Sequence, residues 1–146
     1  MNNEMLGKKI LWIAVLAAVL VGCLAMNFGP GWLGGQASVP CLCATLVYIL
    51  TVTAFLVLTC NYRPFARFSL ILSLVTFWCA VCTVVFRLLH TQGILSLLLS
   101  LVFVSAPFYG FRFWFDWDLT YLLAVGISLA WLAWSVWVWR RHRKKQ

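Results

Sequence analysis

The sequence predicts an all-α integral membrane protein, in which residues 1–146 form a single bundle of hydrophobic helices. Apolar residues make up 64% of the chain and charged residues only 10%, whereas soluble domains average about 45–50% and about 25%. The apolar residues also gather in stretches close to the roughly 20 residues that a helix needs to cross the hydrocarbon core. These two observations exclude a soluble domain and a disordered chain.

Five apolar stretches qualify as membrane helices or come close. Their interiors contain no Asp, Glu or Lys, as expected where a buried charge costs at least about 2.5–3.5 kcal/mol. The alternation typical of barrel strands is missing, so helices are predicted. We expect these helices at about residues 10–28, 41–60, 68–89, 94–111 and 119–139. As an alternative, residues 94–111, the shortest stretch, form a re-entrant or interfacial segment beside four spans.

Two connections have a distinct character. Residues 27–40 contain four Gly, two Pro and no charge, which predicts a turn-rich loop. Residues 111–118 are strongly aromatic, and Trp and Tyr favour the headgroup level of a bilayer, so we expect this segment to lie in the interface. Asp118 is expected to cap the last helix, because its carboxylate can accept from free N–H groups there.

The basic residues predict the orientation. Residues 140–146 form a tail with five Lys or Arg, and the positive-inside rule places this tail in the cytoplasm. Five spans divide the Lys and Arg residues six inside to five outside, and four spans divide them nine to two. The charges therefore favour four spans. The Leu-rich composition of 94–111 favours five, because re-entrant backbone needs a polar or protein lining; we predict five and leave the side of the N-terminus open.

The first 23 residues resemble the signal of bacterial lipoproteins. Lys8 and Lys9 precede an apolar run that ends in Leu-Val-Gly-Cys at residues 20–23, and the resemblance implies lipidation of Cys23. However, apolar residues follow Cys23, and the rest of the chain is polytopic. We favour an unprocessed first membrane helix, and we expect an integral protein of the bacterial plasma membrane.

Cys41 and Cys43 are the best candidates for redox chemistry among six cysteines. They follow Pro40, and Pro-Cys-Leu-Cys resembles the Pro-Cys-x-x-Cys of quinone-linked membrane enzymes that generate disulfides, which implies a thiol-disulfide pair. The spacing is one residue instead of two, and a thiolate needs positive charge or a helix N-terminus nearby. We favour Cys as a small apolar residue, and expect no enzyme activity, cofactor or metal site.

Small and hydroxyl side chains recur within the spans. Ala14, Ala18 and Gly22 follow one another at four-residue spacing, as do Gly126 and Ala130, and such stripes let helix backbones approach closely. We expect internal packing as their use, with a homo-oligomer as the alternative. The many Ser and Thr residues of the spans suit interhelical hydrogen bonds; lining a transport path is the alternative.

Several basic residues are candidates for contact with anionic lipid headgroups or other anions. Arg87 lies near the end of the third predicted span, and His90 follows that span directly. The tail attracts anionic lipid at about 1 kcal/mol per basic residue. The tail candidates are Arg140, Arg141, Arg143, Lys144 and Lys145. No nucleic-acid partner is expected of so short a tail.

The function predicted from these features is non-catalytic. We expect a small multi-pass protein that acts as an accessory or assembly subunit, or through lipid, with a membrane-protein partner or a second copy. The alternatives are an oligomeric transporter or channel for a small solute and, third, the thiol oxidoreductase.

Overall fold

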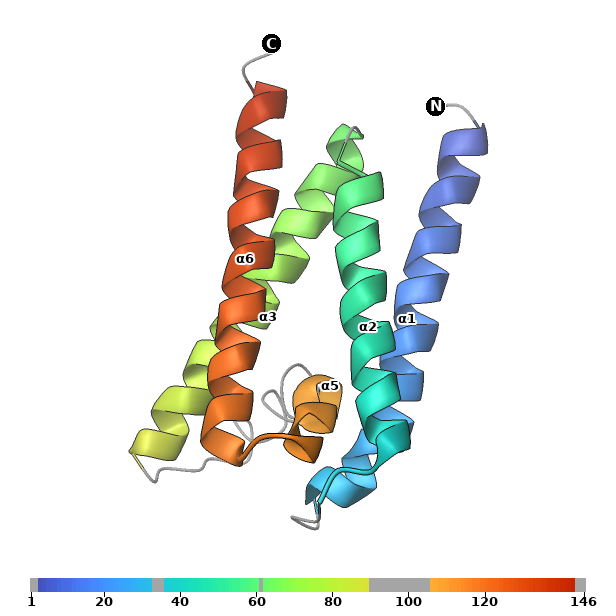
Figure 1. Cartoon of the computed structure of the whole chain (residues 1–146). Helices are drawn as coiled ribbons and strands as arrows, with labels where there is room; N and C mark the ends of the chain where they lie inside the picture. Colours follow the sequence, from blue (N-terminus) through green and yellow to red (C-terminus); the bar gives the residue numbers. More distant parts are fainter. Residues whose placement is uncertain (1–2, 33–35, 61, 90–105, 144–146) are drawn as a thin grey trace.

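The computed structural model describes residues 3–32, 36–60, 62–89 and 106–143 (Figure 1). Within these ranges the chain is helical and has no strand, which confirms the predicted all-α bundle. The elements are α1 (Asn3–Trp32), α2 (Val39–Leu58), α3 (Arg63–Leu88), the short α5 (Ala106–Phe108), the 3-10 helix η2 (Tyr109–Phe113) and α6 (Trp117–Arg143).

Four of these helices are long and apolar enough to cross a membrane: Ile10–Pro30, Val39–Leu58, Arg63–Phe86 and Trp117–Arg143. The fifth predicted segment, 94–111, falls largely outside the described residues. Its described end forms α5 and part of η2, which are too short to cross. The end of α3 and the start of α5 lie at the same end of the bundle (Figure 1), in agreement with the alternative of four spans.

The long helices form two antiparallel pairs, α1 with α2 and α3 with α6 (Figure 1). Both chain termini lie at one end of the bundle. At the other end α5 and η2 lie between the pairs and contact α1, α2 and α6. The two short helices therefore connect the pairs where the long helices leave space between them.

An aromatic cluster makes this connection. The Phe108 side chain of α5 is fully buried, and its ring centre lies 6.2 Å from that of Tyr48 in α2 and 6.3 Å from that of Trp131 in α6. Tyr48 and Trp131 are themselves 6.2 Å apart. Such ring pairs stabilise by about 0.5–1.5 kcal/mol beyond the area they bury, so α5 contributes to the core.

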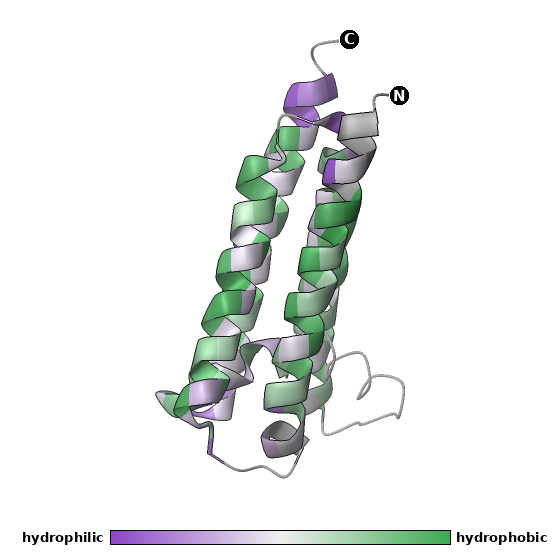
Figure 2. Ribbon diagram, turned by 90° about the vertical axis from the view of Figure 1, so that its right-hand side faces the viewer, coloured by the Kyte–Doolittle hydropathy of each residue, from purple (hydrophilic) through white to green (hydrophobic). Residues whose placement is uncertain are grey.

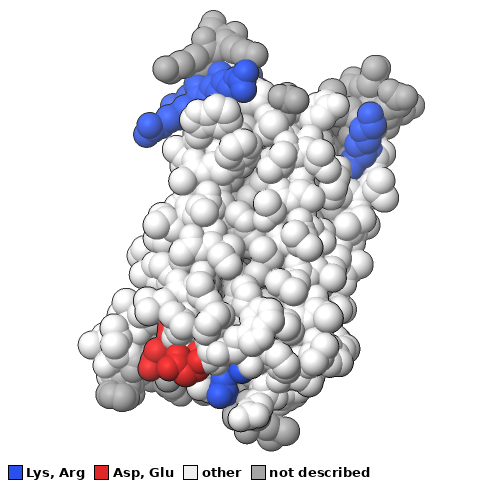
Figure 3. Space-filling model, in the orientation of Figure 1, with Lys and Arg blue, Asp and Glu red and all other residues white. Residues whose placement is uncertain are grey.

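Apolar and charged residues occupy different levels along the axis of the bundle. Apolar residues dominate the long helices, and hydrophilic residues gather at the C-terminal end of α6 (Figure 2). Lys and Arg side chains lie mainly at the end with the two termini, and acidic side chains lie at the other (Figure 3). The described acidic side chains are those of Asp116, just before α6, and Asp118, in its first turn. This distribution fits a chain that spans a membrane.

The expected loop over residues 27–40 is wrong in its first part, because α1 continues to Trp32 and includes Pro30. Proline lacks an N–H, so Pro30 cannot bond the carbonyl of Met26, four residues earlier. The thiol of Cys41 donates to that carbonyl instead, at 3.6 Å. A side chain of α2 therefore satisfies the backbone group that proline frees, which makes a proline acceptable in this helix.

The residue that caps α6 is Asp116, not the predicted Asp118. The Asp116 Oδ1 atom accepts a hydrogen bond from the backbone N–H of Leu119 at 2.9 Å. The helix begins at Trp117, two residues before the predicted start, so Asp118 already lies in the first turn. Its negative charge still suits the positive end of the helix dipole.

Candidate functional site

A buried polar cluster lies where α1, α2 and α5 meet. Asn27 of α1 is 0% exposed. Its Nδ2 atom donates to the carbonyl of Ala106 at 2.7 Å, to Thr45 Oγ1 at 3.2 Å and to the sulfur of Cys23 at 3.4 Å. Thr45 Oγ1 also accepts from the backbone N–H of Gly110 at 2.9 Å. The cluster thus joins segments that are 79 residues apart in sequence.

Local geometry explains which side chains meet there. Cys23 and Asn27 lie four residues apart and share one face of α1. Gly110 permits the close approach of η2, since a Cβ atom there would meet Leu42 Cα and Thr45 Oγ1 at 2.6 Å. Together these contacts hold the backbone of α5 and η2 against α1 and α2.

The chemistry of the cluster is hydrogen bonding. Its described members contribute an amide, a hydroxyl, a thiol and backbone groups. Asn27 Oδ1 is buried without a described donor, and an unmet buried acceptor costs about 1–3 kcal/mol. No group of three or more His, Cys, Asp or Glu within the described ranges is arranged to hold a metal.

Tyr109 extends the cluster toward Arg112. The phenol is fully buried, and burial raises its pKa above the ordinary value, while the positive charge of Arg112 opposes that rise. The guanidinium Cζ atom of Arg112 lies 4.4 Å from the ring centre of Trp117. The phenol is neutral near pH 7 already at its ordinary pKa, and it can therefore donate a hydrogen bond.

The thiols of the predicted redox pair, Cys41 and Cys43, do not face each other. Cys41 is buried and hydrogen-bonded to Ser38 Oγ at 3.2 Å, whereas Cys43 is exposed. Cys41 and Cys43 are two residues apart, which corresponds to a rotation of about 200° around the helix axis. The two thiols therefore point to different sides of α2. The described cysteines are all free thiols.

Cys23, the residue of the lipoprotein resemblance, lies in the middle of α1 and is 2% exposed. Its sulfur lies 3.9 Å from the carbonyl oxygen of Ala106 and 3.8 Å from that of Pro107. In this fold Cys23 contributes to the core.

The basic candidates separate between the two ends of the bundle. Arg140, Arg141 and Arg143 lie in the last turns of α6, while Arg87 lies in the last turn of α3 at the other end. His90, Lys144 and Lys145 lie outside the described residues. Arg87 and the tail therefore do not form one site.

Sequence reasoning missed Asn27, Gly110 and Arg67. The Gly- and Pro-rich composition of residues 27–40 predicts that Asn27 begins a loop. The spacing Cys23–Asn27 on one helical face was the available signal for an inward role. Arg67, in the second turn of α3, lies beside the end of α6, where its guanidinium Cζ atom is 5.4 Å from the ring centre of Trp139. Only the packing of α3 on α6 reveals that contact.

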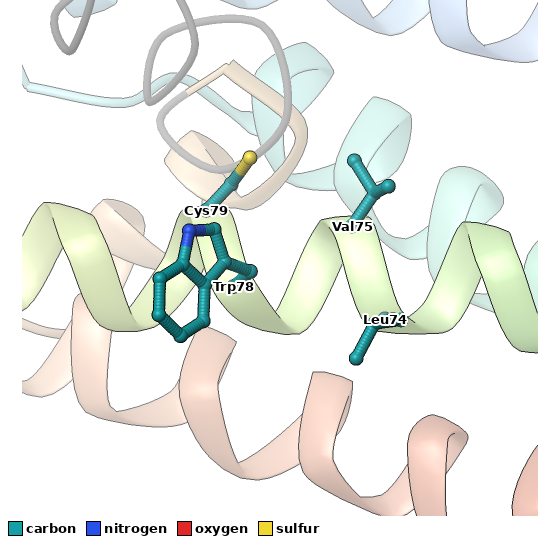
Figure 4. A pocket seen from close by; sticks show the side chains of 4 residues that line it. All are labelled: Leu74, Val75, Trp78 and Cys79. Atoms are coloured by element: carbon teal, nitrogen blue, oxygen red, sulfur yellow. The ribbon is translucent and has the colours of Figure 1, made fainter.

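A shallow apolar hollow of about 420 Å³ lies on α3. Figure 4 shows the described lining residues along successive turns of this helix: Leu74, Val75, Trp78 and Cys79. Trp78 is 65% exposed, as suits a side chain that contacts lipid.

Comparison of the chain with protein-family models, with curated proteins and with solved structures finds no match.

Proposed function

We propose that this chain is a small, non-catalytic multi-pass membrane protein, an accessory or assembly subunit that acts through contact with a partner helix. Support comes from the small-residue stripe of α1. Ala14, Ala18 and Gly22 are exposed, and a Cβ atom added at Gly22 would meet nothing within 4 Å. The expected internal packing of this stripe is therefore wrong.

The position of the stripe follows from helix geometry. At 100° per residue, Ala14 and Ala18 lie opposite Cys23 and Asn27, the buried face of α1. In the span of α1 11% of the residues are buried, against 28% or more in each of the other three spans. Small residues spaced by four let a second helix approach closely in a membrane, so the outer face of α1 suits a helix of a partner or of a second copy.

The second stripe, Gly126 and Ala130 of α6, is exposed as well. A Cβ atom at Gly126 would also meet nothing within 4 Å. Two small-residue stripes on different helices thus face away from the core, and each could receive a helix.

The polar side chains of the spans support a packing role rather than a transport path. Ser73 and Ser135 hydrogen-bond each other between α3 and α6 at 3.0 Å. The indole N–H of Trp131 donates to Thr53 Oγ1 at 3.0 Å, and that of Trp134 donates to the carbonyl of Leu56 at 3.3 Å. These groups are engaged in holding the helices together.

The test uses a bulky substitution on the stripe and a matched one beside it. Ala18→Leu fills the outer face of α1, and Ala17→Leu makes the same change about 100° away on the exposed flank. Photo-crosslinking from the outer face in native membranes should lose its protein adduct in Ala18→Leu and keep it in Ala17→Leu. If the adduct forms equally in both variants, the proposal is contradicted. Solute flux through proteoliposomes of the purified protein would also contradict it.

A further inference from the structure

Three side chains from two helices converge at the end of the bundle that carries both termini. The guanidinium Cζ atom of Arg67 in α3 lies 5.4 Å from the ring centre of Trp139 in α6, and that of Arg143 lies 5.8 Å from the same ring centre. Both arginines are exposed, and Trp139 is half-buried. We call these residues the Arg67–Trp139–Arg143 site.

The contacts around this site fix the end of α6. The imidazole of His142 donates from Nε2 to the carbonyl oxygen of Cys60 at 2.7 Å. This bond holds the last turn of α6 against the connection between α2 and α3. Trp139 thereby lies within reach of arginines that come from different helices.

Basic residues outnumber acidic ones at this end, where Glu4, in the first turn of α1, is the acidic residue of the described helices. Arg63, Arg140 and Arg141 lie in the same end turns of α3 and α6, whereas the described acidic side chains, Asp116 and Asp118, lie at the start of α6, at the opposite end (Figure 3). The positive end of the α3 dipole adds to the field, because α3 begins at Arg63. Two guanidinium groups that share one ring repel each other, and an anion bound to both would remove that repulsion.

The chemistry of the site and its place at the end of two spans favour a phosphate group as the anion. A guanidinium group binds phosphate oxygens through two parallel hydrogen bonds. Tryptophan beside arginine at the end of a span is typical of the headgroup level. We propose that the Arg67–Trp139–Arg143 site binds the phosphate of an anionic phospholipid headgroup. The inference rests on membrane insertion and not on the accessory role, so the two proposals can fail separately.

The test separates a defined site from general attraction to a basic tail. Arg67→Gln/Arg143→Gln removes two charges at the site, and Arg140→Gln/Arg141→Gln removes two charges from the same end outside it. Each protein is reconstituted in vesicles of phosphatidylcholine with a minor fraction of phosphatidylglycerol, and native mass spectrometry counts the retained phosphatidylglycerol. General attraction changes partitioning by about fivefold per basic residue and affects both variants equally.

We expect Arg67→Gln/Arg143→Gln to retain at least about tenfold less phosphatidylglycerol than the control variant, with equal helicity by circular dichroism. Trp139→Leu keeps every charge and should also weaken retention, because the ring that orients both guanidinium groups is lost. Equal losses in the two double variants would overturn the proposal. Displacement of the lipid by inorganic phosphate at equal concentration would assign the site to a free anion and would overturn the lipid source.

Discussion

Asn27 shows how a single polar residue can organise a membrane bundle. Its amide donates to the backbone of α5 and to a side chain of α2, so one residue of α1 contacts both neighbours. In hydrocarbon the alternative for each of these groups is an unmet hydrogen bond. The arrangement leaves the Oδ1 atom of Asn27 buried without a described donor, which is unfavourable.

Asn27→Ala should therefore loosen α5. The carbonyl of Ala106 and the hydroxyl of Thr45 lose a donor, which costs about 1–3 kcal/mol of unfolding free energy. The buried thiol of Cys23 should then react faster with N-ethylmaleimide in detergent, measured by peptide mass spectrometry. Cys43, which is exposed in the intact fold, serves as the internal control and should react at an unchanged rate. Continued protection of Cys23 would contradict the anchoring role of Asn27.

Gly110→Ala tests the close approach of η2 to α2. The added Cβ would overlap backbone atoms of Cys41 and Leu42, which cannot move aside as a flexible side chain can. Overpacking of this kind costs about 1–3 kcal/mol, so thermal unfolding in detergent should occur at a lower temperature.

Gly126→Ala is the matched control for Gly110→Ala, because a Cβ there would meet nothing within 4 Å. Its stability should stay the same or rise by up to about 1 kcal/mol through better helix propensity. Equal effects of the two substitutions would mean that η2 does not need glycine at position 110.

At the scale of elements, the sequence predicts the long helices well and the short ones poorly. Bilayer thickness and the cost of charge define α2 and α6 within a few residues, because those constraints are local. The role of α5 depends on contacts of Phe108 with Tyr48 and Trp131, which are distant in sequence. Periodicity cannot reveal such contacts, and the same holds for Asn27 and Ala106 in the candidate site.

The α3–α6 interface offers a prediction about what holds two membrane helices together. Ser73 and Ser135 are buried and hydrogen-bonded to each other. Ser73→Ala should cost only about 0.6 kcal/mol, the average for such bonds in membranes. Ser73→Leu should cost about 1–3 kcal/mol, because a larger side chain forces the helices apart. Unfolding in dodecyl sulfate, followed by circular dichroism, gives both values. A loss for alanine as large as that for leucine would show that the missing hydrogen bond, and not the added bulk, determines the cost.

At the scale of the whole molecule, four long helices and a short connecting segment place both termini at one end (Figure 1). The same arrangement gathers Lys8, Arg63, Arg67 and the end of α6 at that end. An even number of spans therefore explains both where the termini lie and why the basic residues gather at one end. The sequence count of nine basic residues to two already favoured it, and the apolar composition of 94–111 argued the other way.

Labelling from the two sides of the membrane tests this topology. In a cysteine-free background, Asn3→Cys and Arg143→Cys should both react with a membrane-impermeant maleimide from the same side. Phe113→Cys, on the exposed surface of η2 at the other end, should react from the opposite side, which verifies that the membrane is sealed. The positive-inside rule predicts that the shared side is the cytoplasm. Labels on opposite sides for Asn3→Cys and Arg143→Cys would require an odd number of crossings and would contradict this topology.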